Sequence, residues 1–168
     1  MNRPQPDEFA SYYQTYIDTV SDDVLAELKL QSTAVPNFLR LIDKEKADYA
    51  YAPGKWTLKE LIGHIIDTER IMAYRLLHIV RKDQIPLPGF DENYYVTNSS
   101  YTNRDLDSLI DEFEQLRLAN LFFYQSLTDE ELDRSGIANG HNVSVRALLF
   151  IIAGHVTHHK RIVTERYM

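Results

Sequence analysis

The chain has 168 residues, a formal net charge of −7 and no cysteine. Its length fits a single domain, and a chain of this size buries roughly 70% of the surface that its unfolded form exposes, so folding requires neither a disulfide nor a metal. The acidic balance argues against a general nucleic-acid binder, which normally carries a basic surface. The lack of cysteine excludes disulfides, thiolate metal ligands and a cysteine nucleophile.

The amino terminus and the apolar runs argue against two further classes. The opening residues, "MNRPQPDEFASYY", lack the apolar core of a signal peptide. The longest apolar run, "ALLFIIAG", is far shorter than the ~20 residues that a membrane-spanning helix requires. We therefore expect a cytoplasmic protein that binds neither membranes nor nucleic acids.

Helical periodicity dominates the chain from residue 21 onward. Residues 1–20 form a tyrosine-rich lead-in, after which Ser21 is expected to cap the first helix. Apolar residues recur in this helix at spacings of three and four, and Pro36 predicts a kink within it. Those apolar residues are Val24, Leu25, Leu28, Val35, Phe38, Leu39 and Ile42.

A turn and a capping box mark the start of the second helix. Pro53-Gly54 predicts the turn. Thr57 and Glu60 fit a capping box, and the helix that they start extends to about Lys82. The stretch that follows, "QIPLPGFDENYYVTNSSY", is longer than most connections between helices, and long ordered loops are often functional. We expect this loop to separate the second and third helices of a bundle.

Two more helices complete the predicted fold. The third spans about residues 103–127, and a second capping box, Thr128 with Glu131, then starts a short extra turn. A polar connector, residues 134–142, leads to the final helix, which begins near Ser144. The four long helices predict an all-α four-helix bundle that comprises residues 21–168. Metal and cofactor sites in such bundles are built from side chains on facing helices.

Three of the six histidines lie in one turn of the last helix, in "AGHVTHHKRIV". His155 and His159 are four residues apart and therefore share one helix face, which is otherwise apolar. Burying two imidazoles without partners is costly, and a divalent metal would satisfy both. His158 lies about 60° around the helix from His155 and is expected at the rim. The alternative is a pair of ordinary histidines that are hydrogen-bonded or face solvent.

A metal site of this kind usually has a third protein ligand, and His64 is the best candidate. It lies in "LKELIGHIIDTER", among apolar neighbours on the second helix. Imidazole suits zinc, nickel, iron and copper alike, so the ligand type does not name the metal. A single histidine on an apolar face is also compatible with a core residue bonded to a carbonyl. His78 and His141 are expected to be exposed.

Three segments together resemble the DinB/YfiT-like superfamily of metal-binding four-helix bundles. They are "PGKWTLKELIGHIIDTER", "PGFDENYYV" and "LLFIIAGHVTHHKRIV", and the resemblance covers the predicted bundle domain. It implies a metal triad of His64, His155 and His159, in agreement with the helix-face argument. It also implies that Asp67 lies close enough to orient a ligand and that a loop containing Glu92 covers the metal pocket.

The resemblance further implies a function. We expect a zinc- or nickel-dependent enzyme that transfers a small thiol, such as bacillithiol or mycothiol, to an electrophile. Because the chain has no cysteine, the thiol must come from a substrate. The alternatives are metal-dependent hydrolysis, with Asp67 or Glu92 as general base, and a non-catalytic metal- or ligand-binding protein of a stress response. A homodimer is a further expectation, since bundles that expose an apolar helix face commonly pair.

Overall fold

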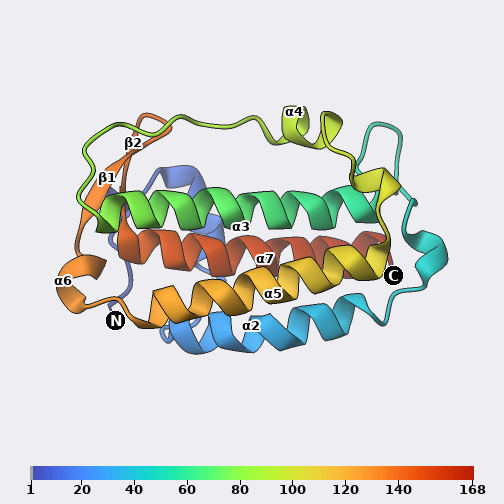
Figure 1. Cartoon of the computed structure of the whole chain (residues 1–168), viewed down its shortest axis with the longest axis horizontal. Coiled ribbons are helices and arrows are strands. Elements are labelled where there is room, and N and C mark those ends of the chain that lie inside the picture. The colour runs from blue at the N-terminus through green and yellow to red at the C-terminus, as the bar shows by residue number, and fades with distance from the viewer. Residues whose placement is uncertain (1) are drawn as a thin grey trace.

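Four long helices form the body of the computed structural model, which describes residues 2–168 (Figure 1). They are α2 (Val24–Leu39), α3 (Leu58–Val80), α5 (Leu106–Gln125) and α7 (Val145–Arg166). The prediction of an all-α four-helix bundle is thereby confirmed. The connections contain α1 (Gln14–Ile17), α4 (Glu92–Thr97), α6 (Asp129–Leu132), the strands β1 (Ser135–Ala138) and β2 (His141–Ser144), and short 3-10 helices.

Polar side chains at the amino ends determine where the helices begin. At the start of α3, the Thr57 hydroxyl accepts the backbone N–H of Glu60, and the Glu60 carboxylate accepts the N–H of Thr57. This is the predicted capping box. The prediction for α2 was wrong by two residues. Asp23 rather than Ser21 caps this helix, because the Asp23 carboxylate accepts the N–H of Ala26 at 3.1 Å.

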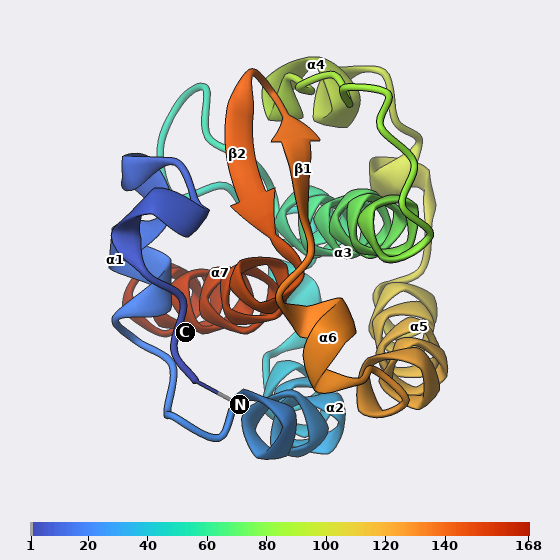
Figure 2. The ribbon, with the colours of Figure 1, turned by 90° about the vertical axis from the view of Figure 1, so that its left-hand side faces the viewer.

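The helices are not arranged around the bundle in chain order. α2 contacts α5 and α7, and α3 contacts the same two helices, so α2 and α3 are diagonally opposed (Figure 2). α3 and α5 run in the same direction, as their colours in Figure 1 show. The connection between them must therefore return along the length of α3. This return explains the long loop, which carries α4 over the outer side of α3 (Figure 1).

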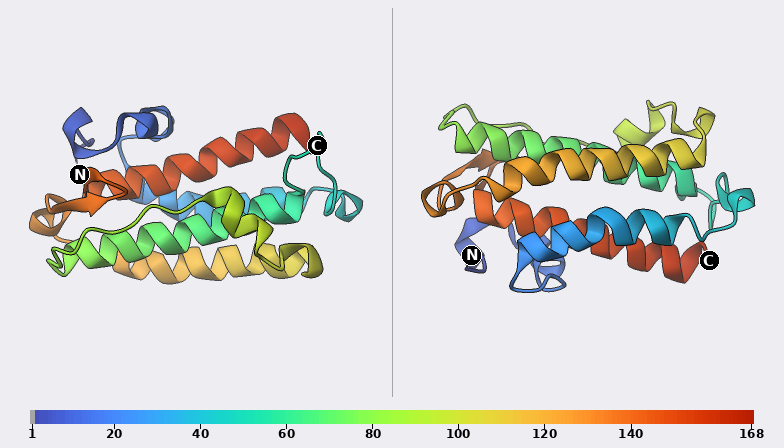
Figure 3. Two further views of the ribbon diagram at one scale, coloured as in Figure 1. Left: turned by 90° about the horizontal axis from the view of Figure 1, so that it is seen from above. Right: turned by 60° about the horizontal axis from the view of Figure 1, so that its bottom comes forward.

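The tyrosine-rich lead-in packs against α7 (Figure 3). Close approach of the two segments requires Gly154, because a Cβ at this position would lie 2.2 Å from the carbonyl oxygen of Tyr16. An ion pair of 3.1 Å between Glu8 and Arg146 ties the start of the lead-in to the start of α7. The lead-in thus forms one side of the molecule, while the domain boundary at residue 20 stays a prediction.

The polar connector contains an antiparallel hairpin that the sequence analysis did not predict. β1 and β2 pair along their whole length. Asn139 and Gly140 form the two-residue turn with φ angles of 52° and 75°, the positive values that such hairpin turns require. The amide of Leu87 donates to the carbonyl of Ile137 in β1 at 2.9 Å, so the hairpin also holds the start of the long loop.

Apolar side chains fill the interior in two clusters. One cluster joins the lead-in, the second half of α3 and the first half of α7. The other joins the first half of α3, α5 and the second half of α7. On α7 the change falls between Ala153 and Val156, beside His155. Among residues 2–168, every helix is too short or too polar to cross a bilayer.

Candidate metal centre

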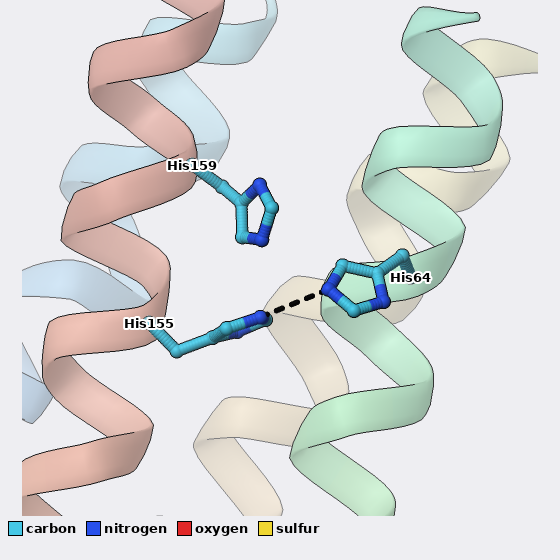
Figure 4. Close-up of side chains that lie close together, drawn as sticks. All are labelled: His64, His155 and His159. Carbon is cyan, nitrogen blue, oxygen red and sulfur yellow. Dashed lines mark hydrogen bonds between the residues drawn. The ribbon is translucent and has the colours of Figure 1, made fainter. Parts of the chain in front are cut away.

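His155 and His159 project from one face of α7, as their spacing predicts (Figure 4). Their ring centroids are 4.5 Å apart. The two residues are 6% and 7% exposed, so water does not reach them freely. The predicted pair of buried imidazoles is therefore present.

His64 approaches this pair from α3, which contacts α7 (Figure 4). Its Nε2 lies 2.9 Å from the Nε2 of His155, and its ring centroid lies 4.9 Å from that of His159. One ligand nitrogen from each of the three residues lies within 4.8 Å of the others. The structure thus brings together the three histidines that the sequence analysis selected.

The arrangement fits a divalent metal better than three ordinary core histidines. Two nitrogens bound to one tetrahedral zinc ion are about 3.4 Å apart, between the 2.9 Å contact and the 4.8 Å limit of this cluster. An ordinary buried histidine is held by a carbonyl or a carboxylate. Here His64 bonds to His155, and Nδ1 of His159 has no hydrogen-bond partner among residues 2–168.

Burial keeps the three imidazoles neutral. It lowers the pKa of His64 from 6.5 to about 4, with a smaller contribution from the positive charge that His158 can carry. Burial also lowers the pKa of His155 and of His159 well below the ordinary value, and the neighbouring histidines lower both further. A neutral imidazole retains the lone pair that binds a metal.

A cavity of about 420 Å³ opens beside the three histidines, large enough for a small molecule. Aromatic side chains form much of its wall, and the ring centroid of Trp56 lies 4.7 Å from that of His64. The aromatic lining residues are Tyr12, Tyr13, Tyr16, Trp56 and Phe90. The lead-in and the long loop both contribute to this wall, so each has a place in the candidate site.

The two acidic residues that we considered as catalytic lie in different surroundings. Glu92, the first residue of α4, lines the cavity together with the histidines. Asp67 is absent from the cavity wall. Its carboxylate lies 3.9 Å from Arg70, one turn further along α3. The cause is helix geometry, because a residue three positions after His64 points about 60° away from it.

The other three histidines lie outside the cluster. His158 is half-buried against Tyr16, with 5.1 Å between the ring centroids, which agrees with a place at the rim. His141 is exposed in β2, as predicted. The prediction for His78 was wrong. Its side chain is only 8% exposed, because the carboxylate of Asp83 lies 3.2 Å from its Nε2 and provides a polar partner.

Thr68 and Arg75 are two cavity residues that the sequence analysis missed. They lie on the same face of α3 as His64, since offsets of four and eleven residues rotate a side chain by about 40° and 20°. Thr68 is 4% exposed and its hydroxyl has no hydrogen-bond partner among residues 2–168. Arg75 is 5% exposed. Helical spacing from His64 is the signal that would have found both.

Comparison with known proteins defines the class. The chain matches the family model of the DinB superfamily over residues 27–163 and belongs to this superfamily. It is also 25% identical over 137 residues to a protein of Oceanobacillus iheyensis named "Putative metal-dependent hydrolase". That match covers 80% of this chain and 78% of the relative.

Solved structures share the fold. One is YfiT from Bacillus subtilis, described as "a probable metal-dependent hydrolase with an unusual four-helix bundle topology". Its TM-score is 0.76 at 17% identity, with 97% of this chain and 91% of YfiT covered. The mycothiol-dependent maleylpyruvate isomerase matches with a TM-score of 0.68 at 17% identity, over 88% of this chain and 62% of that one.

Proposed function

We propose that this chain is a metal-dependent enzyme that binds zinc or nickel through His64, His155 and His159 and transfers a low-molecular-weight thiol to an electrophile. The observation that carries the proposal is the convergence of three buried imidazoles from two helices at the wall of a cavity of small-molecule size. The relative named as a metal-dependent hydrolase supports the metal. Three protein ligands leave coordination positions open, as catalysis requires.

The ion and the substrate thiol have different roles in the proposed reaction. A bound divalent ion would supply Lewis acidity, which lowers the pKa of a thiol or water that reaches it. The thiol belongs to the substrate, because the chain has no cysteine. The thiol gives up its proton, a bond forms from its sulfur to the electrophilic carbon, and the bond from that carbon to the leaving group breaks. The leaving group departs with the electron pair of that bond.

We assign the proton transfer to Glu92. It is exposed at the first position of α4 and lines the cavity. In this role it accepts the thiol proton and returns it to the leaving group. The aromatic wall binds the apolar parts of the two substrates and excludes water, which favours transfer to sulfur over reaction with solvent.

Hydrolysis is the second candidate, and the name of the relative favours it. In that reaction water replaces the thiol, a bond forms from its oxygen to a carbonyl carbon, and the bond from that carbon to the leaving group breaks. Glu92 accepts the water proton and passes it to the leaving group, which departs with the electron pair of the broken bond. The same residues serve both reactions. Thiol transfer and hydrolysis therefore differ only in the nucleophile, and an assay with and without a thiol distinguishes the two reactions.

The test compares the two nucleophiles on zinc-loaded protein. We expect loss of free thiol when 2-mercaptoethanol and an aryl halide are supplied, and no cleavage of a nitrophenyl ester without thiol. His64→Ala should abolish the transfer, and Glu92→Gln should slow it about 100-fold. Glu130→Gln, at an exposed site in α6, is the matched control and should leave the rate unchanged.

Two outcomes contradict thiol transfer. Ester cleavage without thiol that depends on His64 and Glu92 would instead support hydrolysis. Stoichiometric metal with no turnover of either substrate pair would identify a binding protein.

A further inference from the structure

We infer that Arg75 is an anion anchor, which binds a carboxylate carried by the substrate of this cavity. The inference rests on the proposed function in one respect, that the reacting end of the substrate lies at the three histidines. The site for the carboxylate at the other end follows from Arg75 and its surroundings alone. The substrate class is thereby narrowed to small molecules that carry a carboxylate remote from the reacting atom.

Arg75 and the histidines line the same cavity from separate positions along α3. Eleven residues separate His64 from Arg75, so their Cα atoms are about 16 Å apart along the helix and nearly in line. Both side chains lean toward the amino end of the helix, and because arginine is the longer one, its guanidinium comes a few ångströms closer to the His64 ring. A ligand that reaches both groups therefore spans about 10 Å.

Within the part of the chain that the structure describes, no acidic side chain pairs with Arg75. The residue is only 5% exposed, yet no carboxylate of residues 2–168 lies within 4.0 Å of its guanidinium nitrogens. Its contacts are the Pro88 carbonyl oxygen, 2.9 Å from Nη2, and the Met72 sulfur, 3.7 Å from Nη1. Arg117, the other deeply buried arginine, is paired with Glu69 at 2.8 Å. Buried charges are normally paired, so Arg75 stands out among residues 2–168 as a buried charge without an ionic partner.

The surroundings of Arg75 favour a bound carboxylate. The guanidinium lies 6.0 Å from the ring centroid of Phe90 and beside the hydroxyl of Tyr13, which shield it from solvent. A guanidinium has five N–H donors, and the bonds to the Pro88 carbonyl and the Met72 sulfur use two of them. The remaining donors fit a carboxylate, which accepts two parallel bonds. The Thr68 hydroxyl is buried between the two ends, has no hydrogen-bond partner in residues 2–168 and can donate to the middle of the same ligand.

The experiment uses two thiols that differ only at the far end, 6-mercaptohexanoate and 6-mercaptohexanol. Titration calorimetry on zinc-loaded protein measures both dissociation constants. Wild type should bind the carboxylate about 10- to 100-fold more tightly than the alcohol, the range for hydrogen bonds to a charged group. Arg75→Gln should remove this preference, because it weakens the binding of the carboxylate far more than that of the alcohol. Arg81→Gln, which removes a charge from the exposed end of the same helix, is the control and should retain the preference.

Equal binding of the two thiols by wild type would overturn the inference, and this result needs no variant to fold. A preference that survives in both Arg75→Gln and Arg75→Lys would overturn it as well, because the carboxylate would then bind elsewhere. Metal content of the same preparations separates this inference from the proposed function. Protein that takes up no zinc, yet prefers the carboxylate through Arg75, would contradict the metal enzyme and support the anchor.

Discussion

Arg117 is the largest side chain that the bundle buries completely, and it is charged. Its Nε and Nη2 donate to the two carboxylate oxygens of Glu69 at 2.9 and 2.8 Å, a two-bond pair between α5 and α3. Its Nη1 donates to Gln31 of α2 at 2.9 Å. The Gln31 amide in turn donates to the backbone carbonyl of Ala153 in α7 at 3.0 Å, two residues before His155. One polar network thus joins the two histidine-bearing helices to the other two.

We predict that Glu69→Gln lowers the free energy of unfolding by about 3–5 kcal/mol, because it leaves the charge of Arg117 buried without a counterion. Urea denaturation measures this loss. Glu130→Gln, which alters an exposed ion pair with Arg134, is the matched control and should cause no measurable change. Glu69→Leu combined with Arg117→Leu should be less destabilising than Glu69→Gln, since no charge remains buried. Equal stability of Glu69→Gln and wild type would contradict the assigned role of the pair.

The sequence pattern predicted the histidines of the candidate site but did not predict the buried Arg117. His155 and His159 were found because a spacing of four on an apolar face has a direct geometric meaning. Arg117 was missed although it lies on the stripe Phe113, Arg117, Leu121, because charged residues are almost never fully buried unless paired. Its partner is 48 positions away in the sequence, and pairing at that distance becomes visible only in the folded chain.

At the scale of elements, local signals predicted the helix starts better than the connections. Thr57 and Glu60 needed only a four-residue pattern. The long loop was recognised by its length, but the reason for that length is the parallel course of α3 and α5, which no local pattern encodes. The hairpin was missed because its strands are four residues long and one of them contains Gly136. The turn pair Asn139-Gly140 was the signal for it.

The contact between the lead-in and α7 can be tested by adding a single methyl group at Gly154. Replacing a glycine within a helix by alanine ordinarily stabilises the helix by about 1 kcal/mol. We predict the opposite sign for Gly154→Ala, a loss of about 1–3 kcal/mol, because the new Cβ would lie 2.2 Å from the Tyr16 carbonyl oxygen. Thermal unfolding measures the stability, and limited proteolysis should show earlier cleavage within residues 1–20. A more stable Gly154→Ala protein with an unchanged lead-in would contradict this packing.

At the scale of the whole molecule, the bundle closes the candidate site by bringing distant segments to one place. The lead-in, α3 between His64 and Arg75, the long loop, the hairpin turn at Asn139 and the second half of α7 all contribute to the cavity wall. The sequence identified the three histidines, but the assembly of this wall depends on the diagonal arrangement of α2 and α3, which was not predicted. The two apolar clusters provide a core without any metal, so we expect the chain to fold without an ion at the three histidines.

The most direct test of the central claim is the metal content of purified, untagged protein, measured by elemental analysis. Wild type should hold close to one divalent ion per chain, and His64→Ala and His159→Ala should both lose it, because ligands from α3 and α7 are required together. His141→Ala, which alters an exposed histidine outside the cluster, should retain the ion. Wild-type protein that holds no metal and takes up neither zinc nor nickel on addition would contradict the proposed metal centre.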